Sequence, residues 1–159
     1  MALTSAQQQT LKTFILGDAT LNAFPNTADG AFAIAALINQ PASPTFFVWR
    51  SNVPTADCKK AMVWTEFVGR SAGERDAWQF MLSNGILNAA DANVRQGILD
   101  IFSGPSGAGT RAALIAIASR AASVAEKLFA TGTGSQAVPA TMTVEGSLTF
   151  QDVWDARSS

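Results

Sequence analysis

The chain has 159 residues and a formal net charge of −1 from 11 basic and 12 acidic residues, so no basic surplus is available for a phosphate backbone or an anionic membrane. It is 48% hydrophobic and 14% charged, with one cysteine and neither histidine nor tyrosine. The usual proton shuttles, metal ligands and activated nucleophiles are therefore nearly absent, which argues against an enzyme and against a sequence-specific nucleic-acid binder. The composition favours a protein whose apolar surface is covered by partners. The alternative is that many small residues raise the hydrophobic percentage without exposing large apolar patches.

A chain of this length is expected to form one domain with a real hydrophobic core and to need neither a disulfide nor a metal. The start, Met1 to Ser5 followed by three glutamines, has no signal-peptide pattern, and no stretch reaches the roughly 18 apolar residues of a membrane span. We therefore expect a protein without membrane contact, made in a cytoplasm. Cys58 has no intramolecular partner, and its helical apolar context predicts a buried free thiol.

The first third of the chain predicts two helices. One starts from a cap at Thr4 or Ser5 and ends near Leu16, and the next follows Asn26–Thr27 and ends before Pro41. The apolar stripe expected on the second helix comprises Phe32, Ala35 and Ile38, with Ile34 and Leu37 beside it.

The middle of the chain begins with an extended segment. Residues 45–50 are β-branched and aromatic between prolines, which favours a short strand or an extended arm. Pro54 then suits the start of a helix that runs to about Val68. Ser71 and Glu74 have capping-box spacing, and the helix they open is expected to bury Trp78, Met81 and Leu82.

Two further helices are predicted before the tail. Asp91 opens the first, with Val94, Ile98, Ile101 and Phe102 at helical spacing. A Gly, Ser and Pro connector then leads to Thr110, which is expected to cap a central helix that runs to about Ala130. In the tail, residues 141–144 are expected to form a strand. Residues 148–150 are either its hairpin partner or the lead-in to a short helix from Phe150 to Arg157.

These elements predict a mainly α protein, a helical bundle of about five to six helices with a small extended arm or β-hairpin. Residues 1–132 form the helical domain, with its extended segment near 45–50, and residues 133–159 form a C-terminal arm with a strand or hairpin and a short terminal helix.

No motif predicts catalytic, cofactor-binding or metal-binding residues. The segment 104–110 is glycine-rich before a helix but lacks the lysine and Ser or Thr of a phosphate loop. Two carboxylate pairs are considered as acid and base partners, Glu74 with Asp76 and Asp152 with Asp155. Glu74 is better explained as a cap partner and Asp76 as a solvated early-helix charge, and the terminal pair is expected on a short mobile segment. A Ser–Lys arrangement stays open, although no spacing marks one.

The four tryptophans are the most informative side chains, because Trp and Arg are enriched at interface hot spots. Trp64 and Trp78 lie within amphipathic helices and are expected in the core. Trp49 and Trp154 lie near arginines, on the extended segment and near the chain end. The predicted interface residues are Phe46, Trp49, Arg50, Phe150, Trp154 and Arg157.

The chain resembles a group of small structural proteins of tailed bacteriophages. The segments that carry the resemblance are Val63–Glu66, Asn93–Ile98, Leu128–Gly134 and Pro139–Thr141 with Glu145–Gly146. Head-to-tail adaptors of such virions are similar in size and mostly helical, with arms or hairpins that reach neighbours.

This resemblance implies a homo-oligomeric ring of about a dozen copies in the neck of a virion, assembled in the host cytoplasm. Its implied partners are the portal protein and the tail or nozzle proteins. No functional residue transfers, because such proteins act through surfaces. The alternatives are a capsid decoration or tail-completion protein and, in a different class, a small phage-encoded cytoplasmic enzyme or regulator.

Overall fold

The structure is a computed structural model that describes residues 3–159, and the chain is mainly α-helical, at 56% helix. Ten α-helices and six short strands form within the described part of the chain. The helices outnumber the predicted five to six because two long predicted helices are each interrupted and because the four-residue helix α2 was not predicted. In residues 3–159, no helix has the length and apolar character needed to cross a bilayer.

The chain divides into two compact units, each with its own hydrophobic core. Unit 1 comprises Met1–Phe46, Ala121–Thr131 and Met142–Ser159, and unit 2 comprises Phe47–Arg120 and Gly132–Thr141. The backbone therefore passes from one unit to the other four times. Strands β4 (Ser119–Ala121) and β6 (Thr141–Met142) each contain one of these points.

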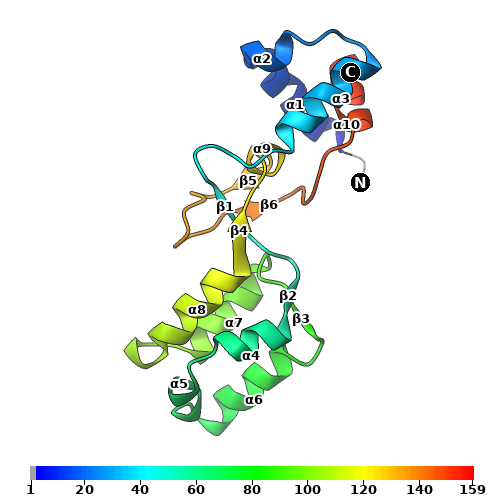
Figure 1. Ribbon diagram of the computed structural model, residues 1–159. Coiled ribbons are helices and arrows are strands. Elements are labelled where there is room, and N and C mark those ends of the chain that lie inside the picture. Colours follow the sequence, from blue (N-terminus) through cyan, green and yellow to red (C-terminus); the bar gives the residue numbers. More distant parts are fainter. Residues whose placement is uncertain (1–2) are drawn as a thin grey trace. The chain divides into compact units, whose positions relative to one another are not determined.

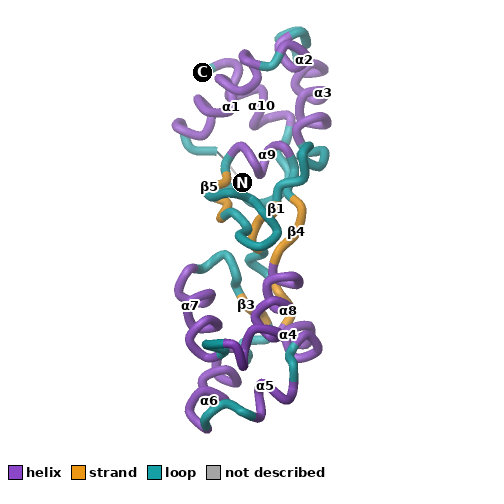
Figure 2. Tube along the Cα trace, turned by 90° about the vertical axis from the view of Figure 1, so that its left-hand side faces the viewer, coloured by secondary structure: helices purple, strands orange, loops and turns teal. Residues whose placement is uncertain are grey.

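Unit 1 is built around three helices from the two ends of its sequence, since α10 packs on α1 and on α3 (Figure 2). Its core includes the fully buried Leu11, Ile15, Ile34 and Val153. The elements of unit 1 are α1 (Ser5–Gly17), α2 (Ala19–Asn22), α3 (Ala28–Ile38), α9 (Val124–Leu128), β5 (Ala130–Thr131) and α10 (Phe150–Ser158).

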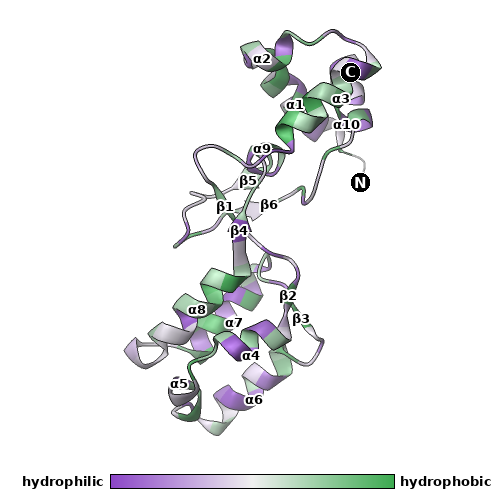
Figure 3. Cartoon of the chain, in the orientation of Figure 1, coloured by the Kyte–Doolittle hydropathy of each residue, from purple (hydrophilic) through white to green (hydrophobic). Residues whose placement is uncertain are grey.

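Unit 2 is a cluster of helices in which α4 packs on α8 and α6 packs on α7 (Figure 1). Its core includes the fully buried Val53, Cys58, Trp78 and Phe102, and hydrophobic residues run along α8 (Figure 3). The elements are β1 (Phe47–Trp49), β2 (Val53–Pro54), α4 (Thr55–Ala61), α5 (Trp64–Val68), α6 (Ala72–Met81), β3 (Ile86–Leu87), α7 (Ala92–Ile101), the 3-10 helix η1 (Pro105–Gly107) and α8 (Ala108–Ala118).

The strands are short and form three two-stranded pairs. Strand β2 is antiparallel to β3, with Val53 opposite Leu87. Strand β1 pairs with β4, and β5 pairs with β6. The predicted extended segment at 45–50 thus contains a true strand, whose partner comes from a region expected to be helical.

Side-chain caps set most helix starts, as the sequence predicted. Thr4 and Ser71 form capping boxes with Gln7 and Glu74, and Asp91 accepts hydrogen bonds from two amides in the first turn of α7. These local bonds satisfy amides that have no partner within the helix.

Two of the helices predicted from the sequence are broken in the structure. The helix expected from Pro54 to Val68 ends at Ala61, and α5 begins again at Trp64. The helix expected from Thr110 to Ala130 begins at Ala108 and ends at Ala118, where β4 and then α9 follow. Thr110 is therefore not a cap; it lies fully buried inside α8.

Of the two predictions for residues 148–150, the lead-in to a helix is the one observed, because Thr149 caps α10 through a capping box with Asp152. The hairpin between residues 141–144 and 148–150 does not form, since β6 pairs with β5 instead. The two compact units do not follow the predicted boundary at residue 132, because α10, which lies after that boundary, packs on α1 and α3 of unit 1.

The stripe predicted on α3 is confirmed only in part. Ile34, Ala35 and Ile38 are buried, whereas Phe32 and Leu37 are 55% and 41% exposed. Gly30 and Ala31 are buried in their place. The buried face of α3 is therefore rotated from the predicted one.

Candidate functional site

Large apolar side chains are exposed on and beside α5 and α6 in unit 2. Phe80 is 79% exposed, Val68 is 65% exposed and Trp64 is 59% exposed. Val63, just before α5, is also exposed. Phe80 lies on α6 and the other three lie on or just before α5, and exposed apolar side chains of this size are candidates for contact with a partner.

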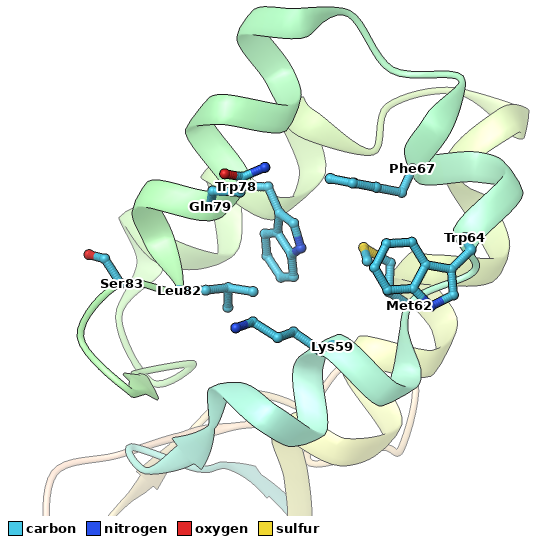
Figure 4. A pocket seen from close by; sticks show the side chains of 8 residues that line it. All are labelled: Lys59, Met62, Trp64, Phe67, Trp78, Gln79, Leu82 and Ser83. Atoms are coloured by element: carbon cyan, nitrogen blue, oxygen red, sulfur yellow. The ribbon is translucent and has the colours of Figure 1, made fainter.

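A cavity of about 590 Å³ lies beside this exposed group, between α4, α5 and α6 (Figure 4). We name it the aromatic pocket. Its eight lining residues are Lys59, Met62, Trp64, Phe67, Trp78, Gln79, Leu82 and Ser83.

The break between α4 and α5 creates this pocket. Met62 has extended backbone angles, and the Val63 amide donates to the Thr110 hydroxyl of α8 at 3.2 Å instead of continuing the helix. The chain therefore turns before Trp64, and the Trp64 ring lies edge-on to Phe67 with centroids 5.6 Å apart. Both rings face the cavity in Figure 4.

Glu66 anchors α5 to the start of α8. Its carboxylate accepts from the backbone amides of Thr110 at 2.7 Å and Gly109 at 3.0 Å. Hydrogen bonds from the Thr110 hydroxyl, from the Thr110 amide and from Gly109 hold the pKa of Glu66 below its ordinary value. The carboxylate thus acts as a distant cap for α8 and fixes the wall of the pocket.

Trp78 forms the floor of the pocket and is only 1% exposed. Its ring packs edge-on against Phe102, with centroids 5.2 Å apart. Its indole N–H has no hydrogen-bond partner among residues 3–159. A buried donor without a partner costs about 1–3 kcal/mol, so this position favours an acceptor from outside the chain.

A second cavity, of about 230 Å³, lies between α7, α8 and residues 137–138 of unit 2. Trp49 lines it, with the Arg95 guanidinium 5.2 Å from its ring centroid. Arg95 donates to the carbonyls of Ala89 and Ala90 at 2.8 Å each, so its charge is engaged with the backbone. The cavity is therefore mainly an apolar groove.

The three predicted interface residues at the chain end are brought together by α10 in unit 1. Phe150 stacks on Phe32 with centroids 4.1 Å apart, and Trp154 packs against the core. Arg157 donates to the carbonyls of Phe24 and Pro25 at 3.0 Å each. All three are half-buried and have partners inside the unit.

The other three predicted interface residues are also half-buried. Phe46 in unit 1 lies under the Lys127 ammonium, 5.6 Å from the ring centroid. In unit 2, Arg50 donates to the Ile117 carbonyl at 2.9 Å, and Trp49 lies under Arg95. Each of the six therefore has a role within its own unit, and a role at an interface stays a prediction.

The exposed group of apolar side chains was not predicted from the sequence. Trp78 is buried as predicted, but the prediction that Trp64 lies in the core was wrong. A signal existed for Phe80, which falls outside the apolar stripe of Trp78, Met81 and Leu82. For Trp64 no local signal marks the break in the helix, because the bond that stabilises it comes from Thr110.

Within residues 3–159, no group of three or more His, Cys, Asp or Glu side chains has the geometry to hold a metal ion. No protein-family model, curated protein or solved structure matches this chain.

Proposed function

We propose that this chain is a structural protein of a tailed-bacteriophage virion, a head-to-tail adaptor that docks under the portal protein and links it to tail components. The resemblance of the sequence segments to such proteins motivates the proposal. The mainly α fold is compatible with it.

The observation that carries the proposal is the exposed apolar group on and beside α5 and α6 in unit 2. Trp64, Val68 and Phe80 are more than half exposed, and Trp is among the residues enriched at interface hot spots. Such side chains lower the free energy when a partner removes them from water, by roughly 25 cal/mol per Å². They favour a protein that works by binding other proteins.

Unit 1 adds a separate set of exposed apolar side chains. Phe32 on α3 and Leu16 on α1 are 55% and 54% exposed, and Phe32 stacks on Phe150 of α10. An adaptor has to contact at least two kinds of neighbour. Two units with their own apolar surfaces meet that requirement.

The finer parts of the proposal are a helical bundle that docks on the portal and a ring of about a dozen copies. The extended segment at 45–50 and the residues after 131 reach neighbouring subunits or receive tail proteins.

The test is the mass of the purified protein in solution, measured by light scattering on a sizing column, alone and with the portal protein. A ring, or a shift of this chain onto the portal, supports the adaptor. A monomer that does not bind the portal overturns it and favours a decoration or tail-completion role, or a catalytic one.

Variants locate the contact. Trp64→Ala and Phe80→Ala should weaken assembly at least tenfold, as expected for interface anchors. Thr65→Ala is the matched control, because Thr65 is exposed on the same short helix as Trp64. Equal assembly of all three variants would show that these side chains are not the contact.

A further inference from the structure

We propose that the aromatic pocket binds a segment of a partner protein in which a large apolar side chain stands next to a carboxylate. The identity of the occupant as a protein rests on the proposed function. The chemistry of the pocket rests on its own residues.

The polar groups that face the pocket indicate an acceptor. The indole nitrogen of Trp78 lies on the side that faces Met62 and Trp64 (Figure 4). That N–H is buried and has no partner within the described residues. A carbonyl or carboxylate oxygen that enters the pocket and displaces the lining side chain over this nitrogen would remove the desolvation cost of this donor.

The charge of the pocket indicates that this acceptor is anionic. Lys59 is the one charged residue among the eight that line it, and its side chain extends across the cavity toward Leu82 and Trp78 (Figure 4). Its neighbour Lys60 points elsewhere, to an ion pair with Asp57 at 3.5 Å. Lys59 forms no such pair with any residue from 3 to 159, so a ligand carboxylate can approach it.

The remaining wall is apolar and fits a large side chain. Met62, Phe67 and Leu82 line it together with the Trp64 ring. Its volume of about 590 Å³ is in the range of ordinary ligand pockets. Methionine and aromatic side chains adapt to varied apolar partners.

The surroundings of the pocket favour a protein segment over a free small molecule. Trp64 lines the pocket and is still 59% exposed, so the entrance lies at this ring. Val63, Val68 and Phe80 are exposed and adjoin the lining residues in sequence. A small molecule would fill the cavity and leave the exposed part of Trp64 in water, whereas a protein segment would also cover this ring.

The probes are two capped peptides, acetyl-Gly-Phe-Glu-Gly-amide and its glutamine analogue, titrated into the full-length ¹⁵N-labelled protein. The chain has four tryptophans, so four indole N–H signals are expected, and a Trp78→Phe variant assigns one of them. The Trp78 indole proton should move downfield as it gains an acceptor. The Glu peptide should bind about fivefold more tightly than the Gln peptide, which is the size of a partly exposed ion pair.

Lys59→Met should remove that fivefold difference, while Lys60→Met should keep it because Lys60 faces Asp57. Trp64→Ala removes an exposed wall and should weaken both peptides without unfolding unit 2. If Trp78→Phe fails to fold, the Lys59 and Lys60 pair carries the test alone.

No shift of the Trp78 signal up to about 5 mM of either peptide overturns the site, since even weak pockets bind at millimolar concentration. Equal affinity for the two peptides overturns the carboxylate. Binding of 3-phenylpropionate as tightly as the Glu peptide overturns a protein segment as the occupant.

The two proposals can fail separately. Peptide binding without a shift onto the portal refutes the adaptor and keeps the pocket. A shift onto the portal by a protein that binds neither peptide refutes the pocket and keeps the adaptor.

Discussion

Asn39 is expected to be the main polar link between the first helices of unit 1 and the segment that leads into α10. It caps the end of α3, and its side-chain amide donates to the Leu148 carbonyl at 2.8 Å and accepts from the Leu148 N–H at 3.0 Å. Leu148 is 4% exposed, so its backbone groups have little access to water. Asn39→Ala removes both bonds at once.

The magnitude follows from those two bonds. Each is worth about 1 kcal/mol net, and a buried group left without a partner costs about 1–3 kcal/mol. Partial entry of water lowers the sum, so Asn39→Ala should reduce the free energy of unfolding by about 2–4 kcal/mol. Asn22→Ala, at an exposed position of α2 in the same unit, is the control and should change it by less than about 0.5 kcal/mol.

Asn39→Asp separates the two bonds. The aspartate keeps the acceptor for the Leu148 N–H but turns the donor into an oxygen that faces the Leu148 carbonyl. At neutral pH this variant should be at least as destabilised as Asn39→Ala. The neutral acid regains an O–H donor, so the folded state favours it, and the variant should gain stability relative to Asn39→Ala as the pH falls toward about 4.

The assay is urea unfolding followed by circular dichroism, with hydrogen exchange of the Leu148 amide as a local reading. The reasoning is refuted if Asn39→Ala and Asn22→Ala unfold at the same urea concentration. It is also refuted if the Leu148 amide exchanges as slowly in Asn39→Ala as in the parent.

Three further predictions concern unit 2. Burial, followed by the nearby Asp57 charge, raises the pKa of the Cys58 thiol, so a disulfide reagent at pH 8 should label it at the rate of unfolding; labelling as fast as a free thiol would contradict this. The pKa of Glu66 is lower in the folded state than in the unfolded chain, so the ionised carboxylate stabilises the fold above the ordinary pKa range of glutamate. This stabilisation is lost as the pH falls through the folded-state pKa. The difference in unfolding free energy between the parent and Glu66→Gln should therefore shrink on acidification. A methyl group at Gly107 would overlap the Phe102 carbonyl oxygen, so thermal unfolding should show Gly107→Ala to be strongly destabilised, whereas Gly73→Ala in α6, with nothing near the added carbon, should be neutral or stabilising.

The helix starts could be predicted because caps are local. The serine or threonine and its Glu, Gln or Asp partner are three residues apart, as at Thr4, Ser71 and Thr149, so the signal lies in a single window of sequence. The same signal was present at Ser123 and Glu126, where a capping box opens α9. It was missed because the alanine-rich run around it has high helix propensity.

The helix breaks could not be predicted because distant residues stabilise them. The Arg50 amide donates to the Ala118 carbonyl at 2.8 Å, and the Ala122 amide donates to the Phe46 carbonyl at 2.8 Å. These bonds draw residues 119–121 into a strand against helix propensity. The aromatic pocket depends on a similar distant hydrogen bond, from the Val63 amide to the Thr110 hydroxyl. The sequence therefore did not predict that the lining residues of the pocket come together.

The order in which the ribosome releases the chain has a consequence for unit 1. Its helices α1 and α3 emerge well before α10 (Phe150–Ser158), on which they pack. All residues of unit 2 precede Met142, so unit 2 can be complete while unit 1 still lacks its closing helix. Until α10 has emerged, the apolar faces of the first two long helices remain open to chaperones and to other nascent copies.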